Sequence, residues 1–434
     1  MKAAAALIVA GVLGAGALTG VWLAHRGVSV DSTHAPSPST AADVVVDAAV
    51  DAVDAAPPPD ASVDAAVVAP QPALVDDYGG HGLARFGWAV TALAIQPDQR
   101  VVVCGTRTLV YGQTSPAVAA RLLADGSLDD TFGTAGVVDL GDQDCRGVAV
   151  LTDGRVVATG TLVTVLSSTG AILDRPSVFS IGALTVAATA DGGFVVAAGD
   201  SYSVGINSFR ARDALLRYDA ELLPLLSFGT NGVQIQISDA FWPRPRTVGL
   251  VVEGAGPGEH VLVGFYAAIR AMGTASGQLD GTFSATVATD GAVGLASNGH
   301  EAAAAFFRDG VRVVRIPSQG TAQPELLLGT SESTGPGLGA QAAPVVSDSL
   351  GRFIVLSIGG GSQVHAWRLE SAGIDQAWSD AHSFAVSPDC PPGAPCGVCD
   401  GAVSGAVITG DDSVVVAGTC YGTNGYGFVA KLRP

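Results

Sequence analysis

Short apolar runs rich in Val and Ala alternate with turn residues along the chain from residue 73 onward. Seven pairs of these runs have the form of a β-hairpin, as in GVAVLTDGRVVATG, where Asp-Gly joins two Val-rich runs. Asp and Gly both readily take positive φ, so this pattern is a strong hairpin signal. The seven predicted hairpins are residues 91–105, 147–160, 184–199, 247–264, 292–307, 343–359 and 405–418.

A second repeated element separates the hairpins. Its best copy is AVAARLLADGSLDDTFGTAGVVDL at 117–140. This segment predicts a strand, an Asp-Gly turn, the dipeptides Leu-Asp and Phe-Gly, and a second strand. Positions that correspond to the Leu-Asp dipeptide lie 45 to 56 residues apart in successive copies, which is a near-constant period. The residues that mark the copies are Asp76, Asp129, Asp174, Pro224, Asp280, Glu325 and Asp375.

Seven hairpins and seven markers predict seven repeats of about four strands, the size of one propeller blade. The end of the chain, GFVAKLRP, matches the start of the best copy, and the expected continuation is found at 73–82 as ALVDDYGGHG. The pattern therefore predicts an all-β fold, a β-propeller of about seven blades over 73–434. Its N-terminal strand would complete the last blade and hide two sheet edges.

The motif ARLLADGSLDDTFGTAGVV and the VxxDGRVVATG hairpins resemble the delta-60 repeat, a propeller-forming repeat common in myxobacterial and related bacterial surface proteins. The resemblance covers most of 73–434, with two or three closely matching copies. It implies a location in the cell envelope more than any chemistry.

The first 72 residues divide into two parts. Residues 1–27 contain a basic start, Lys2, and an apolar run over 3–24 that fits an export signal and is also long enough to span a bilayer. A cleaved signal peptide and an uncleaved membrane anchor both remain open. Residues 28–72 are rich in Ala, Asp, Val and Pro, contain no Lys or Arg, and predict a disordered linker. The chain is thus expected in the periplasm, on the outer surface or outside the cell, with membrane contact through 3–24 if uncleaved.

The net charge argues against one class of function, and the cysteines predict disulfide bonds. The net charge of −18 argues against nucleic-acid binding, which needs clustered Lys and Arg. Six cysteines in an exported chain favour disulfides, although Cys396 and Cys399 also have zinc-ligand spacing without a second CxxC. The hairpin positions predict the bridges Cys104–Cys145, Cys399–Cys420 and Cys390–Cys396.

No nucleophile motif, HExxH or close His pair occurs, so the sequence predicts no catalytic, cofactor-binding or metal-ligating residue. Carboxylates of Asp125, Asp129 and Asp130 have the oxygen ligands that calcium prefers. However, their spacing does not follow an EF-hand loop, and the step recurs as a structural turn. Cofactor content stays open, with calcium as the weak candidate.

Aromatic residues offer one candidate binding patch. Trp242 lies beside Arg244 and Arg246, and this group would bind a carbohydrate or protein of the cell surface if exposed. The alternative is that Trp242 packs between blades, as large aromatic residues usually do.

The leading hypothesis is a non-catalytic envelope or secreted propeller that acts as a binding or scaffold module for an unidentified partner. The alternative is a propeller enzyme of the lactonase, lyase or dehydrogenase type with a metal or cofactor in the central channel. Inner strands such as GVAVL and GAVIT lack charged groups, which argues against that alternative. A third hypothesis is a protein that only spaces or decorates the surface.

Overall fold

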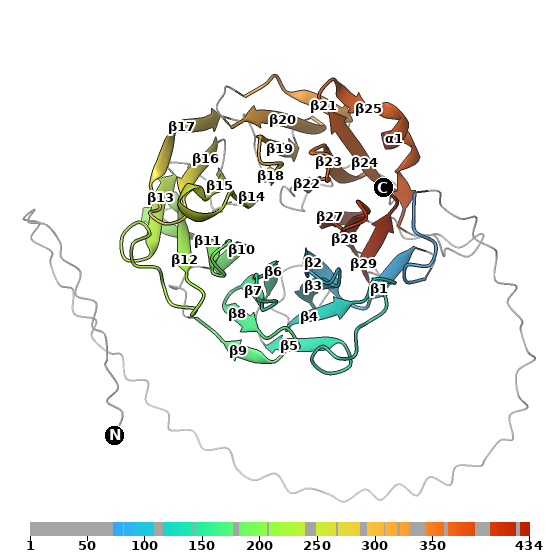
Figure 1. Cartoon of the computed structure of the whole chain (residues 1–434), viewed down its shortest axis with the longest axis horizontal. Helices are drawn as coiled ribbons and strands as arrows, with labels where there is room; N and C mark the ends of the chain where they lie inside the picture. Colours follow the sequence, from blue (N-terminus) through green and yellow to red (C-terminus); the bar gives the residue numbers. More distant parts are fainter. Residues whose placement is uncertain are drawn as a thin grey trace, which may run out of the picture. The chain divides into compact units, whose positions relative to one another are not determined.

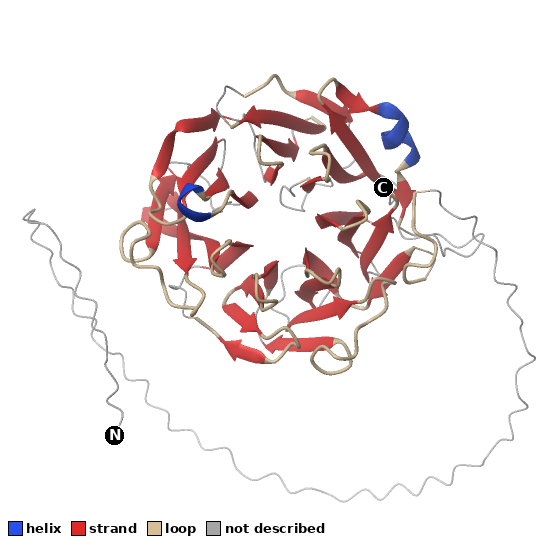
Figure 2. Cartoon of the chain, viewed as in Figure 1, coloured by secondary structure: helices blue, strands red, loops and turns tan. Residues whose placement is uncertain are grey.

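The computed structural model describes most of the chain beyond the linker. The described residues are 73–80, 82–107, 116–141, 144–176, 182–205, 208–238, 249–265, 268–286, 293–307, 309–318, 322–329, 343–359, 363–386, 400–421 and 426–434. Every strand in them belongs to one of seven antiparallel sheets. The sheets are arranged around a common centre, each with its first strand innermost (Figure 1; Figure 2). The predicted seven-bladed β-propeller is confirmed.

The first four blades each contain four strands in sequence order. Blade 1 consists of β2 (Ala89–Ile95), β3 (Val101–Thr106), β4 (Ala117–Leu122) and β5 (Val137–Gly141). Blade 2 consists of β6 (Cys145–Val150), β7 (Val156–Gly160), β8 (Val163–Leu166) and β9 (Ile172–Asp174). Blade 3 consists of β10 (Gly182–Ala188), β11 (Phe194–Gly205), β12 (Ser208–Tyr218) and β13 (Val233–Ser238). Blade 4 consists of β14 (Gly249–Glu253), β15 (His260–Phe265), β16 (Ala268–Gly273) and β17 (Leu279–Thr286), with a short 3-10 turn at Gly256–Gly258.

Blade 5 keeps this plan, whereas blades 6 and 7 depart from it at the outer edge. Blade 5 consists of β18 (Val293–Ser297), β19 (Glu301–Phe307), β20 (Val311–Pro317) and β21 (Leu326–Gly329). Blade 6 contains β22 (Val345–Ser347), β23 (Phe353–Gly359), β24 (Gln363–Glu370), β25 (Gly373–Asp375), β26 (Phe384–Ala385) and the helix α1 (Gln376–Ala381). Blade 7 consists of β27 (Asp400–Ile408), β28 (Val414–Tyr421), β29 (Tyr426–Leu432) and the N-terminal strand β1 (Leu83–Phe86).

The N-terminal strand closes the ring as the sequence predicts. Strand β1 pairs antiparallel with β29, with Leu83 opposite Ala430 and Phe86 opposite Gly427. An isolated bridge also joins Leu74 to Leu432, at the place where Leu128 bridges Leu122 in blade 1. The two chain ends therefore share one sheet, and this blade cannot form without both.

The inner hairpins lie where the pattern places them, but their turns differ from the expectation. In blade 2, Gly154 N donates to Leu151 O at 2.9 Å, and Leu151 N donates to Arg155 O at 2.8 Å. Only Gly154 takes positive φ (85°), whereas the side chain of Asp153 accepts a bond from Arg155 N. Positive φ at both Asp and Gly is therefore wrong for this hairpin, because the left-handed Gly154 follows a standard turn whose end the Asp153 side chain stabilises by accepting from Arg155 N.

The hydrophobic core lies between blades. Seven clusters of buried side chains occur, and each is shared by two successive blades around the whole ring. The small side chains that dominate the composition allow sheets to approach face to face. In strand β4, for example, all six residues of AVAARL are buried. Stability of a blade therefore depends on its two neighbours.

Three blades carry an aromatic–glycine pair in the loop before the outer strand, and we call each of these pairs a latch. The latches are Tyr78-Gly79 in blade 7, Phe132-Gly133 in blade 1 and Phe228-Gly229 in blade 3. Their glycine N–H groups donate to Asp125 O, Thr169 O and Ser276 O of the next blade, at 2.6, 2.9 and 2.8 Å. The three aromatic rings are at most 1% exposed, so each latch inserts a ring between two blades.

Blade 6 has a helix in place of a latch. Asp375 caps α1 by accepting a bond from Trp378 N at 3.2 Å. Trp378 stacks on His382 with ring centroids 3.8 Å apart and joins the cluster that contains Leu74 and Leu432 of blade 7. The repeat pattern predicts a strand and a turn at Asp375, whereas the structure has a helix there.

A second set of contacts joins the tips of the inner hairpins. Polar groups of one tip bond to the next blade at several junctions. The bonds are Gln96 Nε2 to Gly154 O, Arg155 Nη2 to Ala220 O, Ala190 N to Glu259 Oε1, Asn298 Nδ2 to Gly351 O, Ser349 N to Asp412 Oδ1 and Gly410 N to Gln99 Oε1. These bonds restrain blades relative to one another at the tip face of the ring. In the part of the chain that the structure describes, no helix has the length and apolarity needed to cross a bilayer.

Candidate functional site

Three cavities lie at two adjacent junctions, between blades 7 and 1 and between blades 1 and 2. The first, of about 380 Å³, opens beside the closing strand β1, and we call it the seam groove. The second, of about 250 Å³, borders the tips of blades 7 and 1 and is called the seam cavity. The third, of about 430 Å³, lies between the tips of blades 1 and 2 and is called the tip cleft.

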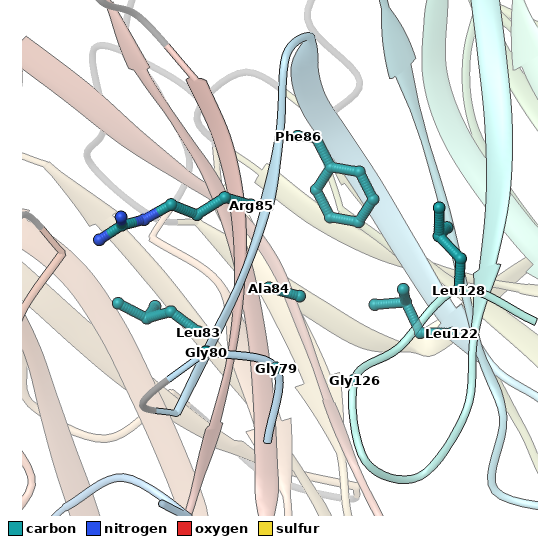
Figure 3. A pocket seen from close by; sticks show the side chains of 9 residues that line it. All are labelled: Gly79, Gly80, Leu83, Ala84, Arg85, Phe86, Leu122, Gly126 and Leu128. Atoms are coloured by element: carbon teal, nitrogen blue, oxygen red, sulfur yellow. The ribbon is translucent and has the colours of Figure 1, made fainter. Parts of the chain in front are cut away.

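The seam groove is mainly apolar. Figure 3 shows Ala84 and Phe86 of β1 directed toward Leu122 and Leu128 of blade 1, while Arg85 extends to the other side of the strand. The Arg85 guanidinium lies 5.3 Å from the centre of the Tyr426 ring. The alternation along β1 thus supplies two apolar side chains to the groove and places the charge away from it.

The latch of blade 7 separates the seam groove from the seam cavity. Gly126 takes φ of +79°, and a Cβ at this position would lie 2.8 Å from Gly79 N and 3.0 Å from the Tyr78 ring. Glycine is therefore required here both by conformation and by close approach. Gly126 lines the groove and Tyr78 lines the cavity, so one contact forms a wall of both.

The seam cavity has apolar walls and a polar rim. Its apolar lining comes from Val101, Leu123, Ala124 and Val415. Its polar lining comes from Tyr78, Gln99, Thr409, Asp411 and Lys431.

The polar rim is organised around one carboxylate. Lys431 Nζ lies 3.2 Å from Asp411 Oδ2, and Thr409 donates to Asp411 Oδ1. Burial opposes ionisation of this carboxyl, but hydrogen bonds from Thr409 and Lys431 outweigh it and hold the pKa of Asp411 far below its usual value. The cavity is therefore bordered by a paired carboxylate and ammonium, the Gln99 amide and the Thr409 hydroxyl, next to apolar side chains.

The tip cleft contains a buried ion pair. Arg121 and Asp129 are each 3% exposed, with Arg121 Nε 2.8 Å from Asp129 Oδ2. Arg121 also donates to Thr131 Oγ1 at 3.0 Å and to the Ser168 carbonyl of blade 2. Burial would raise the pKa of Asp129, but bonds from Thr131 and the charges of Arg121 and Arg100 lower it. The ion pair is thus satisfied within the fold and stabilises the junction.

The aspartates proposed for calcium serve turns. Asp129 pairs with Arg121, and Asp125 Oδ1 accepts bonds from Ser127 N and Ser127 Oγ at 2.9 and 2.6 Å. Among the described residues, no group of three His, Cys, Asp or Glu is placed to hold a metal ion. The geometry around Asp125 and Asp129 therefore gives the calcium interpretation no support.

One predicted disulfide is confirmed. Cys104 at the middle of β3 and Cys145 at the start of β6 form a bridge with Cα atoms 6.0 Å apart, and this bridge links blade 1 to blade 2. Cys420 is also disulfide-bonded, and the backbone register places it opposite Gly401. Cys390, Cys396 and Cys399 lie outside the described residues, so the two remaining pairings stay predictions.

The aromatic patch chosen from the sequence, Trp242 with Arg244 and Arg246, also lies outside the described residues. The residues that line the seam cavity were not singled out from the sequence. One signal could have found them: the repeat has Phe132 and Phe228 at two latches but Tyr78 at the third. A polar substitution at a buried repeat position marks a departure from the purely structural plan.

Comparisons with known proteins add little. No protein-family model matches the chain, and no curated protein matches it. Among solved structures, one described as the Dos1 propeller is similar, with 12% identity and a TM-score of 0.47, over 80% of this chain and 93% of that one.

Proposed function

We propose that this chain is a non-catalytic binding or scaffold module of the bacterial cell envelope, built from delta-60-like repeats. The observation that carries the proposal is the closed, cross-linked ring. Shared hydrophobic clusters, tip-to-tip hydrogen bonds and an inter-blade disulfide hold neighbouring blades in place. A ring held in this way presents its loops and clefts with little loss of conformational entropy on binding.

The disulfide supports export. Bridges of this kind form and persist in oxidising compartments and are rare in the bacterial cytoplasm. Together with the apolar N-terminal run, Cys104–Cys145 is consistent with a folded part outside the inner membrane. Fractionation of cells that express the full chain, with maleimide labelling before and after reduction, tests this. A reduced, cytoplasmic chain would contradict the proposal.

The binding role is tested with the full chain carrying a C-terminal tag. Elemental analysis and absorbance come first, and we expect substoichiometric metal and no chromophore. Capture from an envelope extract should then retain a surface protein or glycan, with a tagged exported protein of similar charge as control. A stoichiometric metal or a chromophore would instead favour the propeller-enzyme alternative and overturn the proposal.

A further inference from the structure

The tip turn of blade 4 is held by a different device from the turn of blade 2. In blade 2 the side chain of Asp153 accepts a bond from Arg155 N at 3.0 Å. Blade 4 has no aspartate in its tip turn, residues 254–259, which contains the short 3-10 turn. Its base is closed instead by two side chains that lie opposite each other on β14 and β15, Glu253 and His260.

Both nitrogens of the His260 ring face hydrogen-bond acceptors. Nδ1 lies 3.2 Å from Gly258 O, and Nε2 lies 2.8 Å from Glu253 Oε2. A carbonyl oxygen can only accept, so Nδ1 carries a proton. A second proton must lie between Nε2 and Oε2, because without it two lone pairs would face each other. Whether the pair is an imidazolium with a carboxylate or an imidazole with a carboxylic acid, the contact holds one shared proton.

The shared proton lies in a partly buried place. The side chains of Glu253 and His260 are 10% and 32% exposed. Burial raises the pKa of Glu253 above its usual value, although His260 opposes this rise. Glu259, the carboxylate within the turn, bonds elsewhere, since it accepts from Ala190 N at 2.6 Å and from Thr274 Oγ1 at 2.8 Å. Among the described charged groups, His260 is therefore the one that acts on Glu253.

The same turn joins blade 4 to blade 3. Glu259 is 5% exposed and bonds to Ala190 in the tip turn of blade 3. Asp191, the carboxylate beside Ala190, already pairs with Arg217 at 2.6 Å. Gly258, whose carbonyl accepts from the imidazole, directly precedes Glu259 in the chain. Loss of the imidazole bond would therefore free the peptide that positions Glu259 against blade 3.

We infer that the proton shared by Glu253 and His260 is a pH-sensitive switch that holds the tip turn of blade 4 against blade 3. When this proton is lost, the Nε2 lone pair and the carboxylate repel each other, the ring turns away, and its bond to Gly258 O breaks. The folded pair binds a proton that the open turn releases, so the contact is present at lower pH and is lost as pH rises. This switch does not depend on the proposed binding function and adds a form of regulation to the ring.

Hydrogen exchange followed by mass spectrometry tests the switch in the full chain. Rates are measured from pH 6 to pH 9 and corrected for the pH dependence of exchange in free peptides. Protection of residues 254–259 and of Ala190 should fall about fivefold to tenfold over this range, the loss of one hydrogen bond. The tip turn of blade 2, residues 151–155, contains no histidine and is the internal control. Constant protection in blade 4, or an equal fall in both turns, would overturn the inference.

Two variants separate the switch from a purely structural role. Glu253→Gln supplies an amide that donates to Nε2 and leaves the proton on Nδ1, so protection of the turn should stay high at every pH. His260→Gln removes the titrating ring and should lower protection to the same extent at every pH. Thermal denaturation establishes that both variants fold. If Glu253→Gln retains the pH dependence of wild type, the pair does not hold the proton and the inference fails.

Discussion

The two junctions on either side of blade 1 are built from the same motif and differ in how they are completed. Between blades 1 and 2, the junction contains Phe132, the Arg121–Asp129 ion pair and the Cys104–Cys145 disulfide. Between blades 7 and 1, the latch is Tyr78, whose hydroxyl is unbonded.

The corresponding cations also differ in their surroundings. Arg121 and its partner Asp129 have side chains that are each 4% exposed, whereas Lys431 faces Asp411, whose side chain is 61% exposed. Both junctions border a cavity at their tips, but the ion pair beside the tip cleft is buried, whereas the carboxylate at the seam cavity is exposed to water. The difference teaches that aligned positions of a repeat can hold a buried ion pair in one blade and a solvent-exposed ion pair in another.

The largest difference is expected from removal of the two cations. Arg121→Met should lower the free energy of unfolding by about 3–5 kcal/mol, because Asp129 would stay buried with only the partly exposed Arg100, 3.3 Å away, as a cationic partner. Lys431→Met should cost less than about 1 kcal/mol, because water can solvate Asp411. Urea denaturation followed by tryptophan fluorescence measures both. Equal effects of the two substitutions would contradict the distinction between the junctions.

Glycine substitutions test the latch itself. Gly126→Ala should destabilise by about 2–4 kcal/mol, from positive φ and from the close approach of Gly79 N. Gly154 is the matched control, since it has φ of +85° but its nearest neighbour would be 3.5 Å away. Gly154→Ala should therefore cost only about 1–2 kcal/mol. Thermal denaturation compares them, and similar losses would show that the latch contact contributes nothing beyond backbone conformation.

Removal of the disulfide should reduce the difference in stability between the two junctions. The bridge closes a loop with a sequence separation of 41 residues, and Cys104→Ala with Cys145→Ala should cost about 2–4 kcal/mol. Hydrogen exchange should then rise in β2 and β6, the inner strands of blades 1 and 2, while β1 and β29 stay as protected as before. An increase in hydrogen exchange spread evenly around the ring would contradict a local stabilising effect of the disulfide.

The smallest effect is a pH dependence at the helix junction between blades 6 and 7. Burial lowers the pKa of His382 below its usual value of 6.5, against hydrogen bonds that raise it, and burial also lowers the pKa of His365. The unfolded chain then binds protons that the folded chain does not, so stability is complete above about pH 6.5 and falls as pH decreases below it. His382→Gln should remove part of this slope in denaturation midpoints between pH 7.5 and 5.5. An unchanged slope would exclude His382 as its source.

The blade plan could be predicted because its signals are local. A hairpin needs only two Val-rich runs and a turn, and seven of them at a regular spacing specify seven blades. Ring closure was also predictable, because the end of the chain matches Ala119–Leu122 and its continuation stands at the front. The Cys104–Cys145 pair followed from the same plan, which brings the end of one hairpin beside the start of the next.

Details of the repeat alignment were less secure. Bridges from Leu122 to Leu128 and from Tyr218 to Pro224 place Pro224 at the position of Leu128, one residue away from the marker alignment with Asp129. The helix α1 was missed because a short capped helix and a strand-turn step have similar composition over six residues. Asp375 decides between them by capping the helix with its side chain.

The sequence by itself determined a ring of about seven blades, their order and the place where the ring closes, because these depend on periodic patterns and on neighbours along the chain. Only the tertiary structure decided which polar residues form buried contacts between blades and which line a cavity. Tyr78, Gln99, Asp411 and Lys431 come from both ends of the described chain, and Arg121 resembles Lys431 in the aligned motif. Their different roles arise from burial and from partners in the next blade, and neither property is encoded within a single repeat.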